Sequence, residues 1–207
     1  MKQAARPYSQ SCRQVQADLT RLLLLQAARD LLVNETEAGR FTLDAVALRA
    51  GASRATVFNL FGGKSGLLHA LVDELSTRAG LMNVDALLTQ TDAHQALRDY
   101  VQAFADFYQT ERTLLKKLRA CAALDKDFAL LLDVREDKRS AGLTYLVQRL
   151  QGTPLNRRPT ASQRLLAAKL KALLVLEVFE SLAGGNSSLN AVAPTVISMV
   201  EAVLESS

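Results

Sequence analysis

The sequence has few of the features that mark a secreted or a membrane-spanning protein. Two cysteines among 207 residues, Cys12 and Cys121, do not make a disulfide framework. No apolar stretch approaches the roughly 18 residues that a membrane-spanning helix needs. The apolar run Leu22–Leu25 is too short for the core of a signal peptide. We therefore expect reduced thiols in a cytoplasmic protein.

Patterns for catalysis and for metal binding are also missing. The two histidines, His69 and His94, form no HxxxH pair, and no CxxC pattern accompanies them. Neither a phosphate-binding glycine loop nor a recognisable Ser-His-Asp set occurs. We predict no metal, no cofactor and no enzymatic activity.

Residues that break helices are scarce, with 4 prolines and 10 glycines in the chain. The 49% apolar and 22% charged composition is that of a globular protein, and no stretch keeps the strict alternation of a half-buried strand. The pattern predicts an all-α fold, in which a mobile arm over residues 1–14 precedes helices over about 15–37, 43–50, 54–60, 64–79, 92–109, 112–123, 125–151, 159–183 and 191–205.

Positive charge is concentrated at the start of the chain. Residues 1–64 hold nine basic and five acidic residues, whereas residues 65–207 hold 16 of each sign. A basic first third beside a neutral remainder suggests a module that binds a polyanion. The alternative is a basic face that is merely solvated.

Residues 41–61 have the pattern of a helix-turn-helix. Thr42 and Ser53 are good N-caps for two short helices, and Gly51 suits the sharp turn between them. The small side chain of Ala47 lets the helices cross closely. Leu43, Val46, Val57 and Leu60 would then face inward, and Ser53, Arg54, Thr56, Phe58 and Asn59 would face outward. In a basic segment this motif predicts DNA binding; the alternative is an ordinary helical hairpin in an all-α core.

Residues 20–75 resemble the N-terminal domain of the TetR family of transcriptional regulators. The resemblance lies in the order and spacing of Ala27-Ala28, Phe41-Thr42-Leu43, Ala50-Gly51-Ala52-Ser53, Thr56-Val57-Phe58 and Gly63-Lys64-Ser65-Gly66-Leu67-Leu68. The remainder matches only as further helices. In that family this remainder binds a small effector and forms the homodimer.

The resemblance implies a role for each residue on the predicted DNA face. Thr42 and Lys64, at helix N-termini, would contact phosphates. Base edges or nearby phosphates would be contacted by Ser53, Arg54, Thr56 and Asn59. Among these, Arg54 suits guanine and Asn59 suits adenine. Phe58 stands where the family usually has a tyrosine, whose hydroxyl reaches a phosphate, and phenylalanine has no hydroxyl to donate.

Aromatic residues on the later helices predict a cavity for a largely apolar effector, because pockets between the helices of a bundle often take apolar ligands. The candidate lining is Tyr100, Phe104, Phe107, Tyr108, Cys121, Phe128, Tyr145 and Phe179. For each of these residues the alternative is ordinary core packing.

The last two predicted helices carry more apolar residues than one layer buries, which predicts a homodimer interface. The candidate interface residues are Leu170, Leu174, Val178, Val196 and Val200.

The predicted organisation is an arm (1–14), a helix-turn-helix DNA-binding domain (15–63), a connecting helix (64–79) and an effector-binding and dimerisation domain (80–207). The predicted function is that of a transcriptional repressor. It would bind a palindromic DNA operator as a homodimer and be released from the DNA by a small-molecule effector. The competing prediction is a helical small-molecule sensor or carrier that does not bind DNA.

Overall fold

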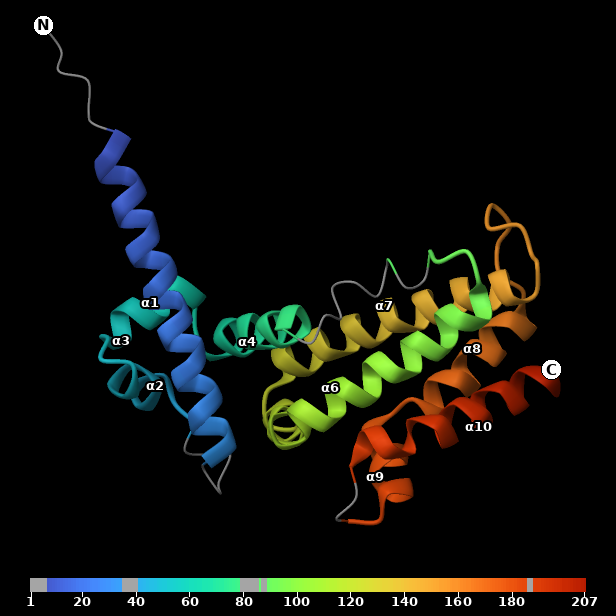
Figure 1. Ribbon diagram of the computed structural model, residues 1–207. Coiled ribbons are helices and arrows are strands. Elements are labelled where there is room, and N and C mark those ends of the chain that lie inside the picture. Colours follow the sequence, from blue (N-terminus) through green and yellow to red (C-terminus); the bar gives the residue numbers. More distant parts are fainter. Residues whose placement is uncertain (1–6, 35–40, 79–85, 87–88, 186–187) are drawn as a thin grey trace, which may run out of the picture. The chain divides into compact units, whose positions relative to one another are not determined.

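The computed structural model describes residues 7–34, 41–78, 86, 89–185 and 188–207, with the side chains of residues 7–13 left out. Every regular element in these ranges is a helix, as predicted. The elements are α1 (Pro7–Asn34), α2 (Leu43–Arg49), α3 (Arg54–Phe61), α4 (Lys64–Arg78), α6 (Ala93–Ala122), α7 (Lys126–Leu150), α8 (Ala161–Leu173), α9 (Leu176–Ala183), a 3-10 turn (Leu189–Val192) and α10 (Ala193–Glu205) (Figure 1). Among the helices described, none is long and apolar enough to cross a membrane.

The chain divides into two compact units. Unit 1 comprises Met1–Asp73 and Thr113–Ala129, and unit 2 comprises Glu74–Arg112 and Leu130–Ser207. This division differs from the predicted boundaries at residues 64 and 80. The predicted connecting helix is shared between the units, and a segment from the middle of the chain joins the N-terminal unit. Local sequence patterns carry no information about which distant helix ends pack together.

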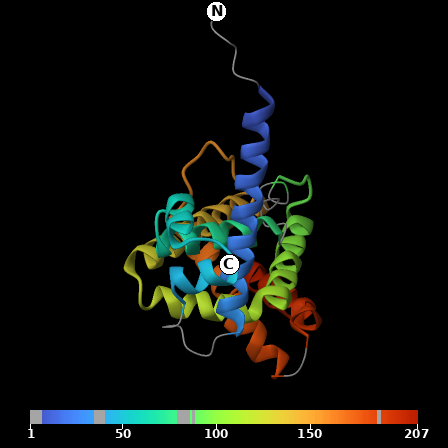
Figure 2. The same cartoon turned by 90° about the vertical axis from the view of Figure 1, so that its left-hand side faces the viewer.

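Helix α1 begins earlier than predicted. Residues 7–14, predicted as a mobile arm, form its first turns from Pro7 onward, a position where proline is well tolerated. The first half of α1 extends past α2 and α3 in both views of unit 1 (Figure 1 and Figure 2). Burial starts only at Leu24, so the second half of α1 contributes to the core. The predicted end of this helix, near residue 37, lies outside the described residues.

Two of the predicted helix boundaries in the later part of the chain are wrong. The expected break between residues 109 and 112 does not exist, and α6 is continuous. The hydroxyl of Thr110 donates to the carbonyl of Asp106 within the helix, and no glycine or proline interrupts the segment. Conversely, the single helix predicted over 159–183 ends at Leu173 and restarts at Leu176.

A tertiary contact stabilises this break. The carbonyl of Leu174, left without a helical partner, accepts from the Tyr108 hydroxyl at 2.7 Å and also from Nη2 of Arg139. The Arg139 guanidinium lies 4.1 Å from the centroid of the Phe104 ring. Because these donors come from α6 and α7, the α8 sequence alone gives no sign of the break.

Each unit has its own apolar core. In unit 1 it includes Leu24, Ala28, Val46, Val57, Leu67, Leu68 and Leu71. In unit 2 it includes Tyr100, Val101, Phe104, Leu143, Leu146, Leu170, Phe179 and Val196. Helices α8 and α10 pack on each other within unit 2.

Candidate nucleic-acid interface

The turn between α2 and α3 has the predicted local chemistry. The Thr42 hydroxyl accepts from the amide of Ala45 at 3.2 Å, and the Ser53 hydroxyl accepts from the amide of Thr56 at 3.0 Å. Both helices are therefore capped at their N-termini. Gly51 has φ +64°, a left-handed conformation that glycine adopts without strain. The predicted two-helix motif is confirmed.

The predicted inner residues of the motif are wholly or partly buried. Val46 and Val57 are fully buried, Ala47 is nearly so, and Leu43 and Leu60 are half-buried. Helix α2 packs against both α1 and α3. The motif is thus fixed on the core of unit 1, which makes the opposite face of α3 a rigid surface.

The predicted DNA-contacting residues lie mainly on this surface. Thr42, Ser53, Arg54, Phe58 and Asn59 are exposed, whereas Thr56 and Lys64 are half-buried. Phe58 is 57% exposed, which a core residue would not be. Thr56 is turned partly inward, and its hydroxyl lies 2.8 Å from that of Ser53.

Two cations of unit 1 lie over aromatic rings. The Lys64 ammonium, at the first residue of α4, lies 5.6 Å from the centroid of the Phe41 ring, and the Arg21 guanidinium lies 4.8 Å from that of Phe61. Both distances are in the range of cation–π attraction. The rings limit where these cations can reach. The sequence analysis missed Arg21, because nothing in its local pattern shows that α1 crosses α3 at this point.

An acidic residue beside the recognition helix was also missed. Arg54, the first residue of α3, donates from Nη1 to Oδ2 of Asp44 on α2 at 2.5 Å. Both side chains are largely exposed. The only sequence signal would have been that Asp44 is the single acid between residues 41 and 64.

Within unit 1, a hydrogen bond joins the start of α4 to the residue that precedes α7. The Ser65 hydroxyl donates to the Asp125 carboxylate at 2.9 Å, and the amide of Phe128 donates to the same carboxylate at 3.0 Å. The hydrogen bond from the Phe128 backbone amide holds the pKa of Asp125 below its ordinary value. Desolvation of the carboxylate raises this pKa, and the hydrogen bond from Ser65 lowers it further. Asp125 therefore accepts as a carboxylate next to the predicted phosphate anchor Lys64.

Several residues of the predicted effector lining pack on one another inside unit 2. The rings of Tyr100 and Phe104 lie 4.9 Å apart, and those of Tyr108 and Phe179 lie 5.3 Å apart. Tyr100 and Phe179 are fully buried, and burial raises the pKa of Tyr100 to about 12. This cluster is packed core, which is the alternative left open for each residue.

Three other members of the predicted lining lie outside that aromatic cluster in the sequence. Cys121 and Phe128 belong to unit 1, and Tyr145 is half-buried on α7. Burial raises the pKa of the Cys121 thiol, which disfavours the thiolate needed for redox chemistry. A single cavity lined by all eight residues stays a prediction.

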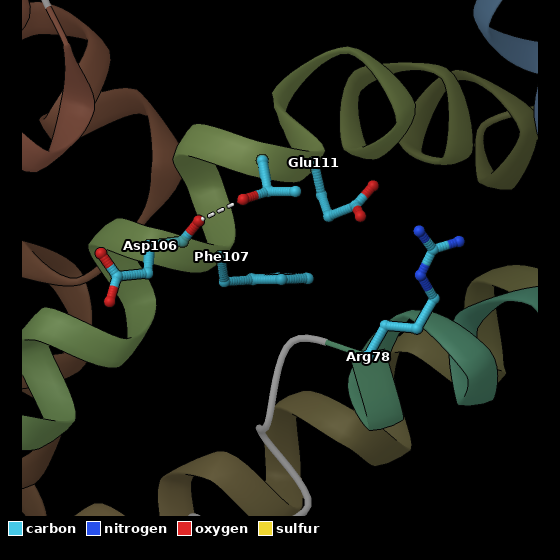
Figure 3. A pocket seen from close by; sticks show the side chains of 5 residues that line it. Arg78, Asp106, Phe107 and Glu111 are labelled. Atoms are coloured by element: carbon cyan, nitrogen blue, oxygen red, sulfur yellow. Dashed lines mark hydrogen bonds between the residues drawn. The ribbon is translucent and has the colours of Figure 1, made fainter.

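A different cavity, of about 280 Å³, lies in unit 2. Its lining is Arg78, Asp106, Phe107, Thr110 and Glu111 (Figure 3). Of these five residues, only Phe107 belongs to the predicted effector lining. The Arg78 guanidinium and the Glu111 carboxylate point toward each other across this space (Figure 3). With three charged side chains, the cavity is more polar than the one predicted.

The predicted dimer interface is wrong for most of its residues. Leu170, Leu174 and Val196 are fully buried within a single chain, and Val200 is nearly so, while Val178 is half-buried. Their apolar surface is used by packing inside unit 2, so a partner cannot reach it. The exposed residues of α8 include Ala161, Leu165, Ala168 and Ala172 at helical spacing, together with Ser162, Arg164 and Lys169.

Comparison with known proteins agrees with this geometry. Residues 24–71 match the family model of bacterial regulatory proteins of the tetR family. No curated protein sequence matches the chain.

Solved structures share the whole fold at low sequence identity. NalD of Pseudomonas aeruginosa, the secondary repressor of the MexAB-OprM multidrug efflux pump, is 18% identical, with a TM-score of 0.64 over 91% of this chain and 96% of NalD. A TetR transcription regulator of Haloarcula marismortui is 15% identical, with a TM-score of 0.68 over 91% and 98%. A protein of Saccharomonospora viridis in complex with choline is 18% identical, with a TM-score of 0.66 over 89% and 96%.

The matched domain coincides with α2, α3 and their supporting helices, and the fold of the whole chain is that of these regulators. Residues 24–71 are therefore similar to the DNA-binding domain of the tetR family of bacterial regulatory proteins, and the rest of the chain shares the fold of these regulators.

Proposed function

We propose that the protein is a repressor that binds a palindromic operator as a homodimer and is released by a small-molecule effector. The observation that carries this proposal is the exposed face of α3, where Arg54 and Asn59 stand on a capped, well-packed helix. A rigid helix that presents an arginine and an asparagine can read the major groove: arginine donates twice, to O6 and N7 of guanine, whereas asparagine donates to N7 of adenine and accepts from its N6 amino group.

The residues around α3 support contacts to the DNA backbone. Lys64 begins α4, where the unpaired amides of a helix N-terminus favour an anion. Thr42 is the N-cap residue of α2, one position before its first residue. Contacts of this type position a protein on the duplex without reading its sequence.

A homodimer follows from the demands of operator reading. Two recognition helices in successive major grooves must stand about 34–36 Å apart, which a two-fold dimer provides. The exposed stripe on α8 that contains Leu165 and Ala168 is the surface that supports such pairing, in place of the buried residues first predicted.

The charged cavity of unit 2 supports a small polar effector in place of the apolar one predicted. Its lining supplies the Glu111 carboxylate, the Arg78 guanidinium and the face of Phe107, while the Asp106 carboxylate points away from the space (Figure 3). A protein of the same fold is known in complex with choline, a small organic cation. An aromatic ring beside a carboxylate suits such a cation.

The contact between Ser65 and Asp125 supports a route for the response. Asp125 caps α7, which continues from unit 1 into unit 2. An effector that favours a different position of α7 would act on the start of α4, where Lys64 stands. Release then follows if the effector binds the non-DNA-binding state more tightly.

The experiment is a titration of the full chain with a palindromic duplex from the promoter region of its own gene, at several salt concentrations. We expect log Kd to rise linearly with the logarithm of the salt concentration. We also expect the palindromic duplex to bind at least about a thousandfold more tightly than a scrambled duplex. Replacing both Arg54 and Asn59 by alanine should abolish the preference and retain the fold. Equal binding to both duplexes, or none, contradicts the proposal and favours the carrier that does not bind DNA.

A further inference from the structure

The ion pair between Asp44 and Arg54 has no evident structural purpose. The side chains are 62% and 67% exposed, so the pair packs against little else, and exposed ion pairs contribute little to stability. Asp44 does stand in the first turn of α2, where an acid suits the helix dipole. That role, however, requires no contact with α3.

A carboxylate on a DNA-binding face carries an electrostatic penalty. It repels phosphates and so weakens binding to every sequence. Asp44 is the only acid between residues 41 and 64, which otherwise hold Arg49, Arg54 and Lys64. Its position against Arg54 places the penalty at the residue best suited to read a base.

The geometry allows Asp44 to orient the Arg54 guanidinium while leaving most of its N–H donors available. A guanidinium has five N–H donors in one plane, and the bond from Nη1 uses one of them. The others remain for the O6 and N7 acceptors of guanine, the base that arginine reads in pairs. A held guanidinium also loses less rotamer freedom on binding than a free one.

The same pairing lowers the attraction of Arg54 for DNA without guanine. A guanidinium beside a carboxylate has little net charge with which to attract a phosphate. It therefore contributes to binding mainly where a base offers two well-placed acceptors.

We propose that Asp44 is a positioning residue that directs Arg54 onto a guanine in each operator half-site, so that the pair sets the base preference there. This inference rests on the proposed function, because it requires that α3 reads DNA. Asp44 itself makes no base contact in this scheme.

The test is selection of binding sites from randomised duplexes by the full chain, followed by titrations of the selected duplex and of one with the guanine replaced by adenine. We expect the wild type to prefer guanine about 10- to 100-fold, the discrimination of a paired arginine contact. In Asp44→Asn, and in Asp44→Ala, which removes the acceptor, the preference should fall below about threefold, while binding to non-specific DNA tightens.

The matched control is Asp30→Asn. Asp30 pairs with Arg49 in the same unit, at 3.5 Å, and its replacement removes the same charge away from α3. It should raise non-specific binding in the same way and keep the full guanine preference. Thermal unfolding of all three variants verifies their fold.

The outcomes separate this inference from the proposed function. A guanine preference that survives in both Asp44 variants but is lost in Arg54→Ala overturns the inference and makes Arg54 the sole reader. Failure of the wild-type chain to enrich any sequence overturns the proposed function, and the inference with it.

Discussion

Replacing Leu165 by glutamate tests whether the exposed face of α8 forms the proposed dimer interface. Leu165 is 60% exposed in the single chain. Full burial of a leucine contributes about 1.5–3 kcal/mol, so a partner that covers the exposed part of Leu165 would add about 1–2 kcal/mol per chain. The two symmetric copies together give about 2–4 kcal/mol, which weakens the dimer roughly 30- to 1000-fold.

The matched control is Val200→Glu on the neighbouring helix α10. Val200 is 1% exposed, and a charge there would be buried without a partner. Removing apolar packing and burying an unpaired charge each destabilise a protein strongly, so we expect a loss of about 3–5 kcal/mol of unfolding free energy. Leu165→Glu, in contrast, should leave the stability of the monomer within about 0.5 kcal/mol of the wild type.

Sedimentation equilibrium gives the dimer dissociation constant, and thermal and urea unfolding give the stability. We expect monomers of native helix content for Leu165→Glu, with much weaker operator binding, and unfolded or aggregated chains for Val200→Glu. A Leu165→Glu chain that sediments as a dimer of wild-type affinity would show that α8 does not form the interface. Native, monomeric Val200→Glu would show that α10 lies at the interface and that its burial in unit 2 is less complete than described.

Three other substitutions test single contacts. Lys64→Ala should weaken binding to all duplexes alike and reduce the slope of log Kd against log salt by about one; a loss confined to one operator base would make Lys64 a base reader. Phe58→Tyr should leave the melting temperature unchanged, because the side chain is exposed, and should tighten binding to specific and non-specific DNA by about 0.5–1.5 kcal/mol, roughly three- to tenfold; a destabilised protein of unchanged affinity would refute it. Tyr108→Phe removes one of the two donors to the Leu174 carbonyl and should lower the unfolding free energy by about 0.5–1.5 kcal/mol in urea titrations, whereas unchanged stability would mean that Arg139 alone satisfies this carbonyl.

The DNA-binding motif could be predicted from the sequence because its signals are local. The caps Thr42 and Ser53 bond to amides three residues away, and Gly51 adopts its positive φ within a single turn. The alternation of inward and outward residues on two short helices follows from helical periodicity alone. For the same reason the exposed position of Phe58 was predictable, since one step along a helix turns it about 100° away from the buried Val57.

Long-range pairing in the same motif was not predictable. Asp44 and Arg54 are ten residues apart and meet only because α2 and α3 cross at a particular angle. Arg21 reaches Phe61, and Ser65 reaches Asp125, only once the helices are packed. These contacts give the candidate interface its electrostatic detail, which no local pattern records.

The roles of apolar residues in unit 2 were the least predictable from the sequence, because they depend on tertiary packing. Apolar side chains on a helix pack equally well against their own chain, a ligand or a partner, so the sequence determined that Leu170 and Phe179 would be covered but not by what. Packing covered both within one chain and left Leu165 outside. The break after Leu173 arose in the same way, since Tyr108 and Arg139 supply from other helices the donors that its freed carbonyl accepts. The sequence by itself thus determined the helices and the DNA-binding motif, and tertiary packing decided which apolar faces became core and which stayed exposed.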